Sequence, residues 1–168
     1  MKRKISPTTK DKISIRLIQE KDLLKTLSWR NLEDSRIWFR TTDIISEESH
    51  KEWFNRYLKK DDDYLFVIEF EDKIVGQIAV YDIDFANGSA EIGRFLVSPD
   101  YSGKGIMSIA CNEVIHLCSK EFNLSYMFLE VRENNDRAIK LYTRQGFSKE
   151  SEYEGFLRMG RYLTDVEI

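Results

Sequence analysis

Cysteine, proline and long apolar runs are scarce in this sequence. Its 168 residues include two cysteines and two prolines. Cys111 and Cys118 fall seven residues apart within one predicted helix, which puts their Cα atoms about 10 Å apart, too far for a disulfide. We therefore expect two reduced core thiols. A catalytic thiol at Cys111 is the less favoured alternative, because buried cysteines are usually inert.

Charge and hydropathy exclude further classes of protein. Lys and Arg total 26 and Asp and Glu total 29, so the chain lacks the basic excess of a general nucleic-acid binder. Its basic start is not followed by the apolar core of a signal peptide, and no apolar run is long enough to span a bilayer. We expect a cytoplasmic protein without nucleic-acid or membrane partners. Residues 1–168 should form one domain, with 1–11 as a loose N-terminal segment.

The spacing of apolar residues predicts an α/β (α+β) domain. Strands are expected at 13–17, 64–71, 73–81, 90–97, 125–132, 147–153 and 156–165, and helices at 20–32, 46–58, 106–122 and 136–145. This order favours a mixed central sheet of six or seven strands flanked by about four helices. Residues 91–132 should form a right-handed crossover between parallel strands, with a ligand at the C-terminal strand ends.

Two glycines stand where the strand at 90–97 gives way to a helix. Gly103 and Gly105 have no Cβ, so a ligand can approach the backbone there. The helix that begins at Ile106 offers unpaired N–H groups and the positive end of its dipole. Together these features predict a site for a pyrophosphate or another anion. A tight turn without a ligand is the alternative, and the position of Lys104 between the glycines excludes a Walker loop.

A second segment, 135–147, gives this loop a context. It reads Asn-Asp-Arg-Ala-Ile-Lys-Leu-Tyr-Thr-Arg-Gln-Gly-Phe and resembles the Asn-x-x-Ala-x-x-Leu-Tyr-x-x-x-Gly-Phe pattern of GNAT-family N-acetyltransferases. The resemblance covers about residues 13–165. It implies a single-domain GNAT-like fold and transfer of an acetyl group from acetyl-CoA to a primary amine, without a metal. The family loop is Arg/Gln-x-x-Gly-x-Gly/Ala, and this chain has Asp100 at its first position.

The resemblance also implies which groups bind acetyl-CoA. Main-chain groups of Phe95, Leu96 and Val97 would bind the thioester and the pantetheine amides, and an N–H near Leu96 would stabilise the developing oxyanion. Asn135 would contact CoA or a bound water, or cap its helix. Backbone N–H groups of the loop would hold the pyrophosphate, and the Lys104 side chain would contribute to its binding. The loop residues assigned to this role are Tyr101, Ser102, Gly103, Lys104, Gly105 and Ile106.

The same resemblance implies the catalytic groups. Tyr142 matches the family tyrosine that protonates the departing sulfur, which a phenol of pKa near 10 can do. The alternative is that its ring simply packs between helix and sheet. Glu91 is our first choice of general base and Glu130 the second. Glu91 as a solvent-facing strand carboxylate is an equal alternative, and some family members have no protein base.

The N-terminal third is expected to line the acceptor site. Its Trp29-Arg30-Asn31 element and the helix with His50 and Trp53 resemble acetyltransferases of amino groups on nucleotide-linked sugars. In such a site arginines would hold a diphosphate, aromatic rings would stack on a base or sugar, and a histidine would bond a hydroxyl or act as a base. The residues assigned to these roles are Arg30, Arg36, Arg40, Trp38, Phe39 and His50. The alternative is that Trp29, Trp53 and Phe54 are ordinary core residues and that the arginines are solvated.

Other interpretations remain open at this stage. The N-terminal amine of a ribosomal protein is the second acceptor class, and it would need a groove with strand edges for a peptide. Polyamines or drugs are the third, and these cations would favour an acidic pocket. Because Asp100 departs from the family loop, a module that binds CoA without catalysis is a further alternative. We expect the partner to be a small-molecule amine acceptor. We expect the protein to be a monomer or a homodimer.

Overall fold

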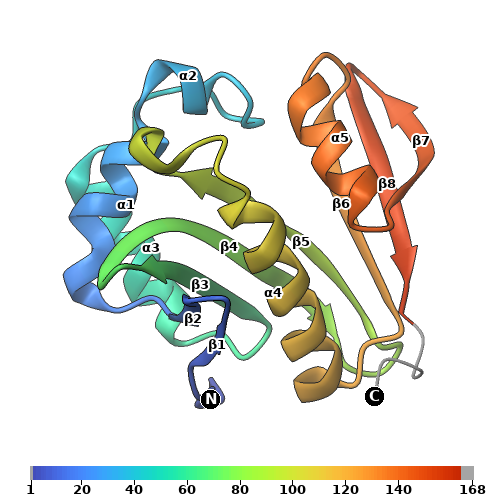
Figure 1. Cartoon of the computed structure of the whole chain (residues 1–168), viewed down its shortest axis with the longest axis horizontal. Helices are drawn as coiled ribbons and strands as arrows, with labels where there is room; N and C mark the ends of the chain where they lie inside the picture. Colours follow the sequence, from blue (N-terminus) through green and yellow to red (C-terminus); the bar gives the residue numbers. More distant parts are fainter. Residues whose placement is uncertain (1, 164–168) are drawn as a thin grey trace.

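Residues 2–163 are described by the computed structural model, and they form one mixed sheet with helices on both faces (Figure 1). The strands are β1 (Thr8–Lys10), β2 (Ile13–Leu17), β3 (Asp63–Phe70), β4 (Lys73–Asp84), β5 (Ser89–Val97), β6 (Tyr126–Arg132), β7 (Ser148–Tyr153) and β8 (Phe156–Tyr162). The α-helices are α1 (Leu23–Arg30), α2 (Glu33–Arg36), α3 (Glu47–Leu58), α4 (Ile106–Phe122) and α5 (Asp136–Arg144), with short 3-10 turns η1 (Glu20–Asp22) and η2 (Pro99–Tyr101). The predicted α/β class is confirmed.

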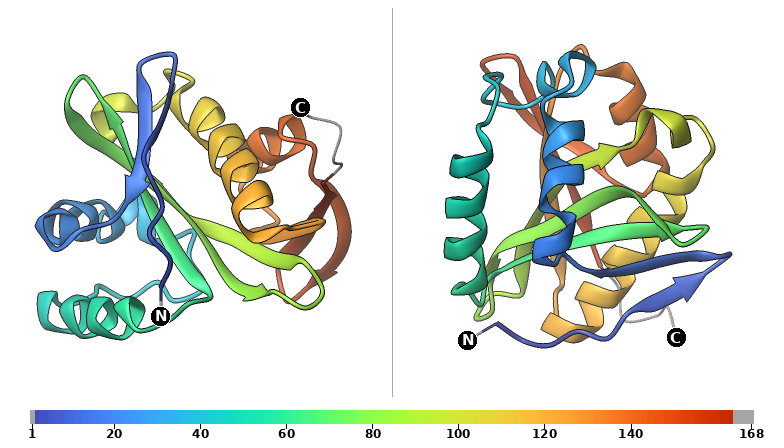
Figure 2. Two further views of the ribbon diagram at one scale, coloured as in Figure 1. Left: turned by 90° about the horizontal axis from the view of Figure 1, so that it is seen from below. Right: turned by 90° about the vertical axis from the view of Figure 1, so that its left-hand side faces the viewer.

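The eight strands lie in the order β1-β2-β3-β4-β5-β6-β8-β7. Neighbours are antiparallel except β5 and β6, which α4 joins as the expected parallel crossover. Helices α1 and α3 cover one face, while α4 and α5 lie on the other (Figure 2). Each face has its own apolar cluster, the larger one under α4. The sheet is therefore packed against helices on both of its faces.

Strands β5 and β6 pair over only a short stretch. Their register runs from Ser89–Tyr126 to Glu91–Phe128 and then stops, although both strands continue. Beyond Glu91 the two ribbons separate, and a V-shaped gap opens between them (Figure 1). The far half of β5 thus has main-chain groups that β6 does not pair with, and this gap ends where the glycine loop begins.

Helix α4 follows directly from its pattern of apolar residues. Its buried positions recur every three to four residues, as one face of a helix requires: Ile106, Ala110, Cys111, Val114, Ile115, Cys118 and Phe122. Both cysteines are free and fully buried, as expected. Burial raises the pKa of the Cys111 thiol to about 12, so it stays protonated near neutral pH. A thiolate nucleophile at this position has no support in the structure.

The N-terminal segment departs from the prediction. Residues 1–11 were expected to be loose, but Thr8–Lys10 forms β1 and pairs with β2 through a turn in which Asp11 and Lys12 both have positive φ. Propensity gave no sign of this strand, which depends on a neighbour supplied by the sheet. It brings the sheet to eight strands instead of six or seven, and α2 is a fifth helix. The last strand ends at Tyr162, and the predicted residues 164–165 lie outside the described residues.

Tight hairpins behave as their sequences indicate. Glu71 and Asp72, between β3 and β4, both have positive φ (53° and 63°), the conformation of a type I′ hairpin turn.

None of the helices within residues 2–163 is long and apolar enough to cross a membrane.

Candidate functional site

The glycine loop has the backbone geometry that its sequence predicts. Gly103 and Gly105 have φ of +77° and +76°, and Gly105 is the N-cap of α4 with no side chain capping that end. A Cβ at Gly105 would meet no atom within 4 Å, and one at Gly103 would meet only Arg137 Nη2 at 3.7 Å. The space above the loop is therefore open. Uncapped helix N–H groups next to open space fit the pyrophosphate of acetyl-CoA.

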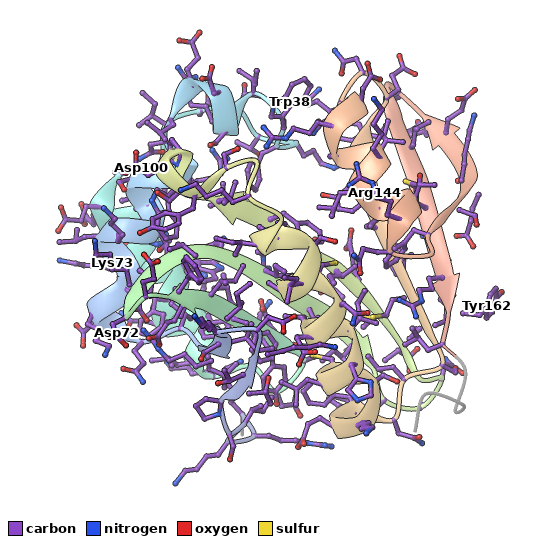
Figure 3. All side chains as sticks on the ribbon, in the orientation of Figure 1. Trp38, Asp72, Lys73, Asp100, Arg144 and Tyr162 are labelled. Atoms are coloured by element: carbon purple, nitrogen blue, oxygen red, sulfur yellow. The ribbon has the colours of Figure 1, made fainter. Side chains whose placement is uncertain are left out.

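Basic side chains near the loop come from two elements. Asp100 is exposed on η2, across the gap from α5 (Figure 3). Lys104 lies over the Tyr101 ring, with Nζ 5.2 Å from its centroid. Arg137 of α5 donates from Nη2 to Ser102 Oγ at 2.8 Å. A guanidinium thus reaches the loop from outside it, and sequence reasoning missed it because the family loop pattern ends at the second glycine.

Tyr142 lies beside the part of β5 expected to hold the thioester. Its side chain is 6% exposed, and its ring centroid lies 4.9 Å from that of Phe95. Burial, with smaller contributions from Cys111 and Tyr81, raises the pKa of Tyr142, so the phenol keeps its proton near neutral pH. The ring does pack between helix and sheet, and this packing fixes the Tyr142 side chain beside Phe95 of β5. Nearby, Asn135 Oδ1 accepts from the Ala138 N–H at 3.3 Å and so caps α5.

The two candidate bases have different surroundings. Glu91 is half-buried at the last paired position of β5, and burial, followed by the charge of Asp82, raises the pKa of its carboxyl. Glu130 on β6 forms an ion pair with Arg40. A carboxylate of raised pKa without an ion pair is the better proton acceptor, so Glu91 remains the first choice.

Replacing Glu91 by Gln should lower the rate of acetyl transfer by about 100-fold or more at pH 8. A base works only when deprotonated, so its contribution is lost as the pH falls through its raised pKa. The ratio of parent to Glu91→Gln rates, measured from pH 5 to 9 with one amine, should therefore shrink toward one at the acid end. Using the ratio cancels the titration of the amine itself. A ratio that is near one at every pH would remove Glu91 from this role.

The segment between α2 and α3 is held in place by side chains on both sides. Arg30 Nη2 donates to the Thr41 carbonyl at 2.5 Å, and Arg132 Nη2 of β6 donates to the Phe39 carbonyl at 2.7 Å. Asn31 Nδ2 donates to the Ile45 carbonyl oxygen, and Asn31 Oδ1 accepts from the Ile45 N–H, each at 2.8 Å. Arg30, Asn31 and Arg132 therefore fix the segment 37–45 between α1 and β6.

The aromatic and imidazole groups assigned to the acceptor fall on two elements. Trp38 is half-buried on the segment after α2, on the side facing the top of α5 (Figure 3). His50 of α3 stacks on Trp53 with ring centroids 5.3 Å apart, and burial lowers its pKa, which keeps the ring neutral near pH 7. Trp53 in turn lies 5.8 Å from the Arg94 guanidinium. His50 is thus linked by contacts to β5 from the face opposite α4.

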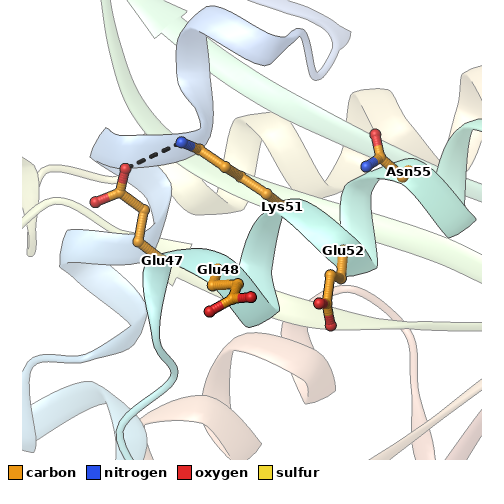
Figure 4. A pocket seen from close by; sticks show the side chains of 5 residues that line it. All are labelled: Glu47, Glu48, Lys51, Glu52 and Asn55. Atoms are coloured by element: carbon orange, nitrogen blue, oxygen red, sulfur yellow. Dashed lines mark ion pairs between the residues drawn. The ribbon is translucent and has the colours of Figure 1, made fainter.

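A separate hollow lies on the outer face of α3 (Figure 4). It is lined by Glu47, Glu48, Lys51, Glu52 and Asn55, with Lys51 paired to Glu47 at 3.2 Å. This is a solvated helix face distant from the glycine loop, and we assign it no role. Among residues 2–163, no group of three or more His, Cys, Asp or Glu side chains is arranged to hold a metal ion.

Comparison with known proteins agrees with this geometry. The model of the acetyltransferase (GNAT) family matches residues 26–147. The uncharacterized N-acetyltransferase MJ1207 of Methanocaldococcus jannaschii is 34% identical over 155 residues, which cover 82% of this chain and 68% of that protein. Spermidine N(1)-acetyltransferase of Vibrio cholerae is 24% identical over 152 residues, covering 89% and 87%. The crystal structure of spermidine N-acetyltransferase from Vibrio cholerae in complex with CoA and spermine has a TM-score of 0.83 at 21% identity, covering 91% and 96%. The range matched by the family model contains the glycine loop and Tyr142.

Proposed function

Since the chain belongs to the acetyltransferase (GNAT) family, we propose that it acetylates the primary amine of a small molecule that carries negative charge, with a nucleotide-linked amino sugar as the best-fitting class. The donor is acetyl-CoA, which supplies the activated acetyl group as a thioester. The open space above Gly103 and Gly105 and the uncapped start of α4 fit its pyrophosphate.

The chain's own groups then have distinct tasks. The loop N–H groups bind the donor, and the half of β5 that β6 does not pair with binds the arm that enters between β5 and β6. An N–H near Leu96 faces the negative charge that develops on the acetyl oxygen. Glu91 takes a proton from the attacking amine, and Tyr142 gives its proton to the leaving sulfur. Positioning both reactants in one gap supplies much of the rate enhancement.

The observation that carries the acceptor class is a group of arginines without carboxylate partners. Arg30, Arg36 and Arg132 surround the segment 37–45, and within residues 2–163 none of them forms an ion pair. Arg30 is 8% exposed, and burial and then the charge of Arg36 lower its pKa. Buried cations without a counterion are costly. An anionic group on the acceptor would supply the missing charge.

Within residues 2–163, three of the five buried side-chain polar atoms without a partner belong to these arginines, and the other two are on β1 (Thr8 Oγ1) and α3 (His50 Nε2). In the described part of the chain, the buried side-chain nitrogens without a hydrogen-bond partner are Arg30 Nη1, Arg36 Nε, His50 Nε2 and Arg132 Nε. The three guanidinium nitrogens can only donate, so they suit phosphate, hydroxyl or carbonyl oxygens and repel ammonium groups. This favours an anionic, oxygen-rich acceptor.

The second candidate is a polyamine, and its support comes from the relatives. Spermidine N-acetyltransferase of Vibrio cholerae resembles this chain over most of its length, at 24% identity in the sequence comparison and with a TM-score of 0.83 in the structural one. The exposed carboxylates of Asp43, within the segment 37–45, and of Glu33 and Asp34 on α2 would attract a polycation.

The test is a comparison of acceptors under one set of conditions. We expect release of CoA thiol from acetyl-CoA to be fastest, by kcat/KM, with a nucleotide-linked amino sugar, against spermidine and a peptide with a free N-terminus. The corresponding nucleoside diphosphate without a sugar amine should inhibit competitively with the acceptor. Highest kcat/KM with spermidine would overturn the proposal in favour of the polyamine.

A charge variant sharpens this comparison. Replacing Arg132 by Gln should raise the KM for the anionic acceptor by roughly tenfold, the loss expected for one charge-assisted contact, and leave the KM for acetyl-CoA unchanged. Arg56→Gln, an exposed arginine on α3, is the matched control and should change neither constant. An unchanged acceptor KM in Arg132→Gln would dissociate the arginines from the acceptor.

A further inference from the structure

Strand β5 has a bulge directly before the segment that should hold the thioester. Between Gly93 and Leu96 it carries two residues, Arg94 and Phe95, opposite the single β4 residue Ile78. Arg94 has φ of +54°, a left-handed conformation that residues with a Cβ seldom adopt. Such a bulge bends its strand and re-aims the main-chain groups that follow it. Something must hold Arg94 in this conformation.

Three side-chain interactions converge on Arg94. Gln77 Nε2 donates to the Arg94 carbonyl oxygen at 3.0 Å, from a side chain that is almost fully buried. The Arg94 guanidinium binds Asp63 of β3 through two bonds, Nη1 to Oδ1 at 2.8 Å and Nη2 to Oδ2 at 3.2 Å. Its guanidinium carbon also lies 4.1 Å from the centroid of the Tyr81 ring. The bulge is therefore tied to β4 through the backbone and to β3 through the side chain.

The tie to β3 is an ion pair shielded from water. The Asp63 side chain is 4% exposed and that of Arg94 is 28% exposed. A buried, bidentate pair has a fixed geometry, which a pair at the surface lacks. It spans β4 and so fixes β5 relative to the middle of the sheet, at the level where β6 no longer supports it.

We propose that Gln77 and the Asp63–Arg94 pair are positioning residues for acetyl transfer. They hold the β5 bulge so that the main-chain groups of residues 95–97 point into the gap in the orientation the reaction needs. This inference rests on acetyl transfer at β5, as proposed above. None of these side chains touches the reacting atoms. Their effect is on the alignment of an N–H that stabilises charge only in the transition state, so they act on kcat more than on donor binding.

The experiment compares two aspartates in equivalent surroundings. Asp22 forms a bidentate pair with Arg16 at 2.8 and 2.9 Å, and its side chain is also 4% exposed, but it lies on η1 away from β5. Both Asp63→Asn and Asp22→Asn should lower Tm. Only Asp63→Asn should also lower kcat, by about tenfold or more, with the Kd for acetyl-CoA within about threefold of the parent.

Gln77→Leu is the second variant, in case Asp63→Asn does not fold. It removes the bond to the Arg94 carbonyl while keeping the size of the side chain and the ion pair. The same drop in kcat at nearly constant Kd is expected. Parental kcat in folded Gln77→Leu, or an equal loss of kcat in Asp22→Asn, would overturn the positioning role. Absence of turnover in the parent protein with every amine would instead count against the proposed function.

Discussion

Replacing Tyr142 by phenylalanine should lower kcat by about 100-fold or more, the usual contribution of a general acid. The variant keeps the ring that packs on Phe95 and loses only the proton that the departing sulfur needs. The Kd for acetyl-CoA should stay within about threefold of the parent, because the loop and β5 bind the donor through other groups. The measurement is thiol release under saturating acetyl-CoA and amine, with Kd from calorimetry.

A second tyrosine serves as the control for this variant. Tyr162 on β8 is 77% exposed, so Tyr162→Phe makes the same chemical change at a surface position and should leave kcat unchanged. Because burial raises the pKa of Tyr142, we also expect the phenol to stay protonated, and so able to act as an acid, to a higher pH than an ordinary tyrosine would allow. Full activity of Tyr142→Phe would leave the ring with a packing role alone.

Replacing Gly105 by valine should weaken acetyl-CoA binding by about 100-fold, equivalent to about 2.8 kcal/mol. The added side chain would fill the open space above the loop where the pyrophosphate is expected. In the protein without ligand this space holds no neighbouring atom within 4 Å, so the effect should appear in the Kd and much less in the fold. Calorimetric titration with acetyl-CoA measures it.

The backbone strain of this substitution needs its own control. Gly155, in the turn between β7 and β8, has φ of +83° and likewise has no atom within 4 Å of a built Cβ. Gly155→Val therefore carries a similar strain, about 1–2 kcal/mol, at a place without a ligand. It should lower Tm as Gly105→Val does and leave the Kd unchanged. Equal Kd values for the two variants would mean that the loop does not approach the donor.

Local signals in the sequence predicted much of the fold. The apolar spacing of residues 106–122 and the two glycines with positive φ depend on interactions within a few residues, and both are present in the structure. Strand β1 was missed because Thr8–Lys10 has no apolar residue and so no alternating pattern, although its partner β2 begins only three residues later. The predicted number of strands was therefore one too low, while the predicted class of fold was correct.

The residues of the candidate site also differ in how far they could be predicted from the sequence. Tyr142 and the glycine loop were predicted because they belong to motifs of contiguous residues. The bulge at Arg94, with its partners Gln77 and Asp63, could not be predicted, because these residues come from three strands and their bonds span up to 31 positions. The acceptor arginines were predicted as ligands, yet Arg30 holds the Thr41 carbonyl and Arg40 pairs with Glu130. Arg132, on β6, was not singled out at all.

Amide hydrogen exchange with and without acetyl-CoA tests the central claim, that main-chain groups of β5 and the glycine loop bind the donor. We expect the N–H groups of residues 101–106 to gain protection, together with those N–H groups of residues 95–97 that face the side of β5 where β6 does not pair. The turn at Gly155 should be unaffected. Saturation with acetyl-CoA that leaves exchange in both segments unchanged, or that protects a different surface, would contradict the account.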